Sequence, residues 1–193
     1  MFIRNTLMWT AMMAVMMLPV AGSWVLAMRR TAVGSQTLLP GLFFSGYLLV
    51  WTIFSLVAAT VQTILFYTGL ASPMGVPTNP LVPGVILVIA GIFQITPLKN
   101  RCLIHCQSPI GFFLTSWRDG RAGAVQMGIR HGFHCVGCCW ALMALAFVAG
   151  VMNLTWMIGV TLFILIDHAI LRTPVLSSLS GAFFLIAGMW FLT

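Results

Sequence analysis

The chain has 193 residues, of which 61% are hydrophobic and only 6% are charged, and its mean hydropathy is +1.07. This composition excludes a soluble globular domain, because such a domain needs far more charge on its surface. It predicts an all-α fold, a polytopic helical bundle in a membrane, since apolar stretches of about 20 residues recur along the chain. Residues 1–193 are therefore expected to form a single transmembrane domain.

Six apolar stretches predict six transmembrane helices, and proline and glycine separate most of them. In chain order the predicted spans are Leu7–Met28, Leu42–Tyr67, Val82–Thr96, Phe133–Met152, Leu154–Leu171 and Val175–Leu192. The first stretch is longer than the core of a signal peptide and lacks a small-residue cleavage pattern. It is therefore expected to be retained.

The formal net charge of +7 comes from nine lysines and arginines against two acidic residues. In a six-span arrangement, all of these cations except Arg4 fall on one side of the membrane. Because positively charged short loops stay in the cytoplasm, this asymmetry predicts both termini outside and a cytoplasmic loop at about 97–132. The charge also suits contact with anionic headgroups of the lipid bilayer. Nucleic-acid binding is the poorer interpretation, because no binding module is recognisable.

All five cysteines and three of the four histidines lie between residues 102 and 139. Thiolates and imidazoles bind soft and borderline metal ions, so this concentration predicts a metal site. A regular helix through the second half of the stretch would place several of these donors on one face. The candidate ligands are Cys102, His105, Cys106, His131, His134, Cys135, Cys138 and Cys139.

Other interpretations of this cluster remain open. Free cysteine is a common small buried residue, so the thiols would then serve only packing. A reducing cytoplasmic location and the odd number of cysteines disfavour structural disulfides. Mixed thiolate and imidazole ligands suit zinc, Cu(I) and iron–sulfur clusters, and zinc is the usual occupant of such sites.

Methionines in the first predicted span favour copper among these metals. Met12, Met13, Met16 and Met17 form i, i+4 pairs, and thioether ligands suit Cu(I) better than zinc. The alternative is that these methionines only fill gaps between membrane helices.

Asp167 is the only acidic residue within a predicted span, and His168 follows it. Ionisable side chains at membrane depth are costly and face the interior of a bundle or a polar cavity. Asp167 is therefore a candidate to orient a metal-ligating histidine. A simple salt bridge with Arg172 is the alternative.

Several segments resemble the bacterial family of predicted metal-binding integral membrane proteins of unknown function. They are Met12–Pro19, Gly46–Ser55, Gln94–Lys99 and the two motifs Cys102-Leu-Ile-His-Cys106 and His131-Gly-Phe-His-Cys-Val-Gly-Cys-Cys-Trp140. The resemblance covers nearly the whole chain and implies a multi-pass protein of the bacterial inner membrane. It implies a metal site at the five cysteines but no established reaction. The chain departs from the family at Asp167-His168, where a Glu-Lys pair is expected.

These features together predict a protein that binds a soft transition metal in metal transport, delivery or metalloprotein assembly. Copper is favoured, and zinc is the alternative. The expected partners are the lipid bilayer and a metalloprotein or membrane complex, with no nucleic acid. An enzyme is the less favoured class, because no nucleophile elbow, phosphate-binding loop or metalloprotease motif is present. The rivals are a thiol-redox, haem or iron–sulfur membrane protein and a non-catalytic subunit of a larger complex.

Overall fold

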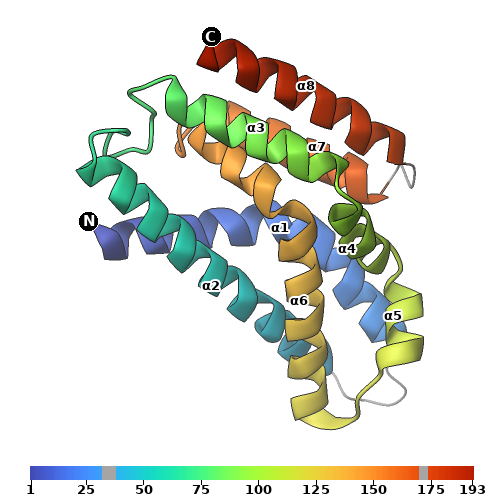
Figure 1. Cartoon of the computed structure of the whole chain (residues 1–193). Helices are drawn as coiled ribbons and strands as arrows, with labels where there is room; N and C mark the ends of the chain where they lie inside the picture. The colour runs from blue at the N-terminus through green and yellow to red at the C-terminus, as the bar shows by residue number, and fades with distance from the viewer. Residues whose placement is uncertain (32–37, 170–173) are drawn as a thin grey trace.

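The computed structural model describes residues 1–31, 38–169 and 174–193, excluding the side chains of residues 31, 168, 169 and 174. The described residues form helices and no β-sheet (Figure 1). In chain order the helices are α1 (Phe2–Thr31), α2 (Leu39–Tyr67), α3 (Leu81–Ile95), α4 (Pro97–Gln107), α5 (Pro109–Ser116), α6 (Gly120–Ala144), the short 3-10 helix η1 (Leu145–Phe147), α7 (Leu154–Ala169) and α8 (Pro174–Leu192). The predicted all-α class is confirmed.

Three helices in the described part of the chain, α1, α2 and α8, are long and apolar enough to cross a membrane. Helices α3 and α4 bend by 68° at the break between them, so together they form either a fourth, broken span or a re-entrant segment. Helix α7 is apolar but shorter. These helices suit a membrane-associated protein, and the count of six spans stays a prediction.

The expected loop at 97–132 is corrected by the structure, because most of this stretch is helical. Helices α4 and α5 lie within it, and α6 begins in it at Gly120. Pro97 and Pro109 open α4 and α5, at the first-turn position where the fixed φ of proline and its missing N–H are tolerated. A search for long apolar runs overlooks both helices, because Lys99 and Arg101 interrupt α4 and because α5 has only eight residues.

The predicted span Phe133–Met152 is also shifted. Helix α6 begins earlier and ends at Ala144, and the chain then turns before α7. Gly150 lies in this turn with a φ of 90°, a backbone conformation that favours glycine.

Helix α6 occupies a central position, with α2 and α4 packed against it and α3 and α7 nearby (Figure 1). Its contact with α2 is the most extensive between any two described helices, and the antiparallel contact of α3 with α8 is the next. Gly46 of α2 and Gly128 of α6 make the first contact close, since a methyl group at either would overlap a backbone carbonyl of the other helix. Such small residues allow helices to approach in lipid, where no hydrophobic effect drives them together.

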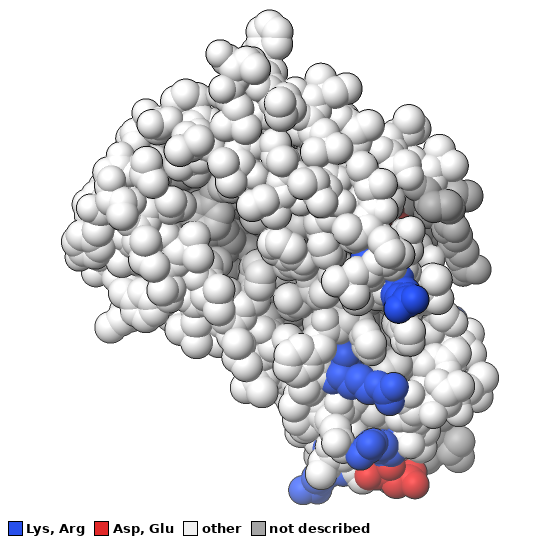
Figure 2. All heavy atoms as spheres, viewed as in Figure 1, with Lys and Arg blue, Asp and Glu red and all other residues white. Residues whose placement is uncertain are grey.

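On one face of the molecule (Figure 2), the described cations gather at one end. On the face shown in Figure 2, they lie over α4, α5 and the start of α6, while the surface over α2, α3 and α8 carries none. Arg29 and Arg30 also mark the last turn of α1. The side of a membrane on which this end lies stays a prediction.

Replacing Gly128 with alanine is expected to destabilise the protein, because the added methyl group overlaps the carbonyl group of Phe43 in α2. Overpacking of this kind costs about 1–3 kcal/mol. The matched control is Gly159→Ala in α7, where the methyl group meets no neighbouring atom within 4 Å and helix propensity improves. Thermal unfolding in detergent measures both variants. Equal shifts in Tm would contradict the close α2–α6 contact.

Candidate metal site

Four of the five cysteines are buried, and they meet where α4 packs on α6. The Sγ atoms of Cys106 in α4 and Cys138 in α6 lie 3.7 Å apart. Cys106 also interacts with Cys135, and the thiol of Cys139 interacts with those of Cys135 and Cys138. Helical spacing places the three α6 cysteines on one side of that helix. We call these four residues the thiol cluster, and it unites the two cysteine motifs.

The thiols of this cluster are engaged in hydrogen bonds. Cys138 and Cys139 both donate to the carbonyl oxygen of Cys135, with Sγ to O distances of 3.0 and 2.8 Å. The hydroxyl of Tyr47 lies 3.4 Å from the Sγ of Cys135. Tyr47 is a site neighbour that the sequence analysis missed, because α2 carries no cysteine or histidine that would draw attention to it.

The donor set fits a thiophilic ion, although it does not form a finished coordination shell. In the described part of the chain, no three Cys, His, Asp or Glu side chains are grouped around one point so as to hold a metal. The Cys106–Cys138 separation is nevertheless close to the roughly 3.8 Å between two sulfurs that share a tetrahedral ion with bonds of about 2.3 Å. Binding an ion as thiolates would remove the protons that Cys138 and Cys139 donate to the carbonyl oxygen of Cys135.

Cys102 lies at the edge of the thiol cluster and is partly exposed. Its Sγ is 3.2 Å from the position that a β-carbon would take at Gly137 of α6. A larger residue at 137 would therefore displace this sulfur. Gly137, which leaves room for this sulfur, is a second residue of the site that the sequence did not indicate.

His105 and His134 form a pair on the outer side of the α4–α6 contact. Their rings stack with centroids 4.7 Å apart and an angle of 9° between the planes. His105 is exposed and its Nδ1 is 2.9 Å from the carbonyl oxygen of Arg101, whereas His134 is half-buried. The solvent exposure of the donor side chains thus decreases from the imidazole of His105, through Cys102, to the buried thiols.

His131 lies in a different environment from the other two histidines. It is buried, and its ring stacks on Trp24 of α1 with centroids 3.7 Å apart, with Tyr47 and Phe43 also alongside. The structure therefore places this predicted ligand one helical turn from Cys135, inside a group of aromatic rings.

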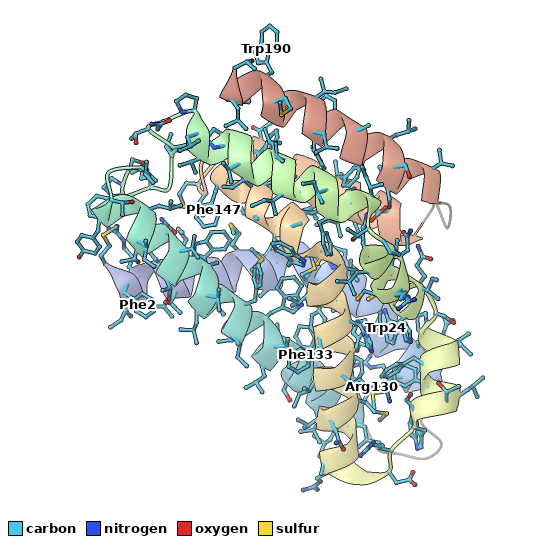
Figure 3. The ribbon with its side chains drawn as sticks, viewed as in Figure 1. Phe2, Trp24, Arg130, Phe133, Phe147 and Trp190 are labelled. Carbon is cyan, nitrogen blue, oxygen red and sulfur yellow. The ribbon has the colours of Figure 1, made fainter. Side chains whose placement is uncertain are left out.

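The predicted methionines face the interior. Met12, Met13, Met16 and Met17 are all buried and belong to the same apolar core as the thiol cluster. Figure 3 shows sulfur atoms among the side chains between α1, α2 and α6. Thioethers and thiols thus share one core, and a direct role of these methionines in metal binding stays a prediction.

Asp167 forms a buried salt bridge with Lys99 of α4, at 2.8 Å between Nζ and Oδ2, and both side chains are at most 1% exposed. Ser177 of α8 accepts a hydrogen bond from Lys99 and donates one to Asp167. The expected partner Arg172 and the side chain of His168 lie outside the described residues. The ion pair joins α4 to α7 and α8, and sequence reasoning did not foresee Lys99 as the partner.

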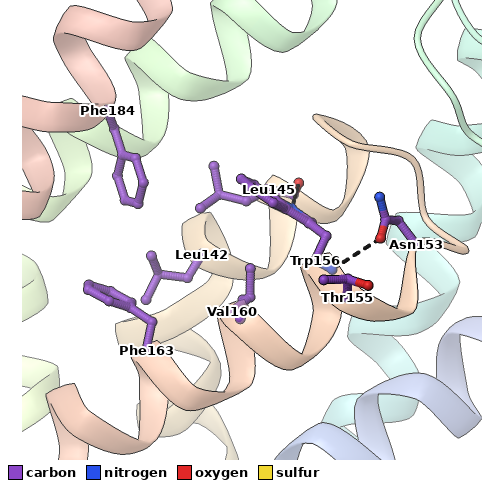
Figure 4. Close-up of a pocket in the computed structure, with 9 residues that line it drawn as sticks. Leu142, Leu145, Asn153, Thr155, Trp156, Val160, Phe163 and Phe184 are labelled. Carbon is purple, nitrogen blue, oxygen red and sulfur yellow. Dashed lines mark hydrogen bonds between the residues drawn. The ribbon is translucent and has the colours of Figure 1, made fainter.

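A separate pocket of about 320 Å³ opens between the end of α6, α7 and α8 (Figure 4). Leu142, Val160, Phe163 and Phe184 dominate its lining, and the indole N–H of Trp156 donates to a backbone carbonyl. Its nine lining residues include no thiol, imidazole or carboxylate. This pocket is therefore not a metal site.

Comparison with known proteins identifies the family. The sequence matches the PpoB2 family, described as copper chaperone, over residues 6–191. No curated protein and no solved structure matches the chain. The family match includes the whole α4–α6 region that carries the thiol cluster, and it supports the predicted relation to copper. The chain belongs to the PpoB2 copper chaperone family.

Proposed function

We propose that this protein is a membrane copper chaperone that holds Cu(I) at the thiol cluster and passes it to a metalloprotein. The observation that carries the proposal is the 3.7 Å contact of the Cys106 and Cys138 sulfurs across two helices. Two thiols from different helices provide a site that closes when the helices are packed and opens when they separate. Copper is here the cargo of the protein.

Cu(I) is favoured over zinc by the chemistry around these thiols. Soft thiolate and thioether ligands select Cu(I), and five buried methionines, four of them from α1, share the core with the thiol cluster. Zinc takes four ligands in a structural site, whereas Cu(I) is satisfied by fewer. The Cys106–Cys138 pair, joined by one further thiol, is enough for such an ion.

The graded exposure of the donors supports loading and release. His105 is exposed, His134 and Cys102 are half-buried, and the thiol cluster is buried. We infer that copper passes between a partner and the thiol cluster by way of these outer donors. Exchange through successive ligands avoids releasing the ion into water at any stage.

The buried pair of Lys99 and Asp167 is inferred to position α4. Lys99 lies one helical turn before Cys102, and its ion pair fixes this end of α4 against α7 and α8. Fixing α4 in this way also sets the distance from Cys106 to Cys138. Both charged residues therefore act as positioning residues.

We further propose the six-span arrangement in the bacterial inner membrane, with α6, α7 and the α3–α4 pair included as crossings beside α1, α2 and α8, and with both termini outside. The basic end of the molecule then faces the cytoplasm, in agreement with the positive-inside rule. The thiol cluster lies near that end, where a reducing compartment keeps cysteines available for copper.

Serine at Cys106 or Cys138 is expected to weaken Cu(I) binding by about tenfold or more, because each change removes one of the paired sulfurs. The double variant should lose much less free energy of Cu(I) binding than the sum of the losses in the two single variants, since both sulfurs bind one ion. Anaerobic competition with a chromophoric Cu(I) chelator measures the affinity. Met74→Leu, which removes an exposed sulfur elsewhere, is the control.

Full additivity would contradict a shared site. Wild-type protein that binds no Cu(I) but forms a reversible Cys106–Cys138 disulfide would instead favour the rival thiol-redox function. The short distance between these two sulfurs is the observation that favours the thiol-redox function as the second candidate.

A thiol reagent that cannot cross membranes is expected to label Cys102 only after cell lysis, because the basic end is proposed to be cytoplasmic. Cys102 is the suitable reporter, since it is the one partly exposed cysteine of five. The control is Tyr67→Cys in a Cys102→Ser background. Tyr67 is exposed and is the last residue of α2, at the end of that helix away from the basic end of the molecule. This cysteine should react in intact cells. The reverse pattern would invert the proposed orientation.

Asp167→Asn is expected to destabilise the protein by about 3–5 kcal/mol, because it leaves the charge of Lys99 buried without its partner. The double variant Lys99→Met with Asp167→Leu should regain most of this stability, since it removes both charges. Thermal unfolding and the yield of oxidative Cys106–Cys138 crosslinking are measured together. If the folded double variant crosslinks as efficiently as wild type, the pair does not position α4.

A further inference from the structure

A second pocket lies between α5 and the first half of α6, outside the thiol cluster. Its volume is about 270 Å³. Its polar side is formed by Ser116, Arg118, Gln126 and Arg130, and its apolar side includes Ile129 and Phe133. No role in the copper function proposed above uses the two arginines.

The two guanidinium groups have only uncharged hydrogen-bond partners. Arg118 donates to the Oε1 of Gln126 at 2.7 Å, and Arg130 donates to the Oγ of Ser116 at 3.1 Å. Among the described residues, the single ion pair is the distant one between Lys99 and Asp167. Two positive charges therefore border one pocket, and within the described residues neither forms an ion pair, although Asp119 is the chain neighbour of Arg118. An anion with several oxygens satisfies both in charge-assisted hydrogen bonds.

Further contacts hold these groups in place. The guanidinium of Arg130 lies over the ring of Phe112 in α5, 5.9 Å from its centroid, and Figure 3 shows Arg130 projecting from α6 toward α5. The nearby carboxylate of Asp119 accepts a hydrogen bond from the indole of Trp117. Arg118 is thus presented from the connection between α5 and α6, and Arg130 from α6 itself, on two sides of the pocket.

The apolar side of the pocket identifies the kind of anion. Phe133 is 62% exposed, and Ile110 and Leu114 on α5 are 64% and 78% exposed. Exposed apolar side chains beside two arginines form an amphipathic surface at the basic end of a membrane-associated protein. A soluble anion would contact only the polar half, whereas a lipid contacts both.

We propose that this pocket binds the phosphate group of an anionic membrane lipid. Arg118 and Arg130 bind the phosphate oxygens, and Phe133 contacts the acyl chains. Basic pockets between membrane helices on the cytoplasmic side are suited to such headgroups. His134 also lines this pocket and stacks on His105, so the lipid lies beside the outer histidine pair. The proposal is independent of copper binding.

The test uses the delipidated full-length protein in a neutral detergent. Phosphatidylglycerol is expected to bind at one per chain in native mass spectrometry and to raise the Tm. Phosphatidylcholine with the same acyl chains, and glycerol 3-phosphate as the free headgroup, should bind far more weakly. The double variant Arg118→Gln with Arg130→Gln should bind phosphatidylglycerol about tenfold or more weakly than wild type.

The matched control is Arg29→Gln with Arg30→Gln, which removes the same charge from the exposed end of α1 and should leave lipid binding intact. An equal loss in both double variants would show general charge attraction and overturn the site. Binding of glycerol 3-phosphate as tight as that of the lipid would overturn the lipid as ligand. Should the double variant fold poorly, Phe133→Gln provides a second test, since losing the apolar contact must also weaken lipid binding.

Discussion

The packing of α6 between α2 and α4 determines the geometry of the candidate site, because α6 supplies three of its four buried thiols. Gly46 and Gly128 bring the backbones of α2 and α6 into contact, which places the hydroxyl of Tyr47 beside Cys135. The opposite side of α6 receives α4 and, with it, the sulfur of Cys106. Any change that separates these three helices therefore moves sulfur atoms as well as backbone.

The buried ion pair and the thiol cluster share one helix, because α4 carries both Lys99 and Cys106. An ion pair without water is costly unless its geometry and hydrogen bonds are good, and Ser177 completes the pair of Lys99 and Asp167 from a third helix. The same pair holds the helix that carries Cys102 and Cys106. In a chain with so few charged residues, a buried pair at this position serves specificity of packing more readily than stability.

The sequence predicted long apolar helices well and short polar ones poorly. Helices α1, α2, α3 and α8 agree closely with the predicted spans. A long uninterrupted apolar run is compatible with few structures other than a helix in a membrane, so it is easily recognised. The sequence did not predict α4, because Lys99 and Arg101 interrupt its apolar pattern, or α5, because it has only eight residues. Local spacing correctly placed Cys135, Cys138 and Cys139 on one face, but contacts between distant segments, such as Lys99 with Asp167 or His131 with Trp24, leave no periodic signal.

The two hydrogen bonds that converge on the carbonyl of Cys135 bear on how readily an ion leaves the thiol cluster. If the proposed ion binds through Cys138 and Cys139, this buried oxygen loses both its sulfur donors, each of them a weak one. The backbone thus competes with the metal for the same sulfurs. In a carrier with this arrangement, the loss of these hydrogen bonds lowers the affinity for the ion. Transfer of the ion to an acceptor then restores the hydrogen bonds within the carrier.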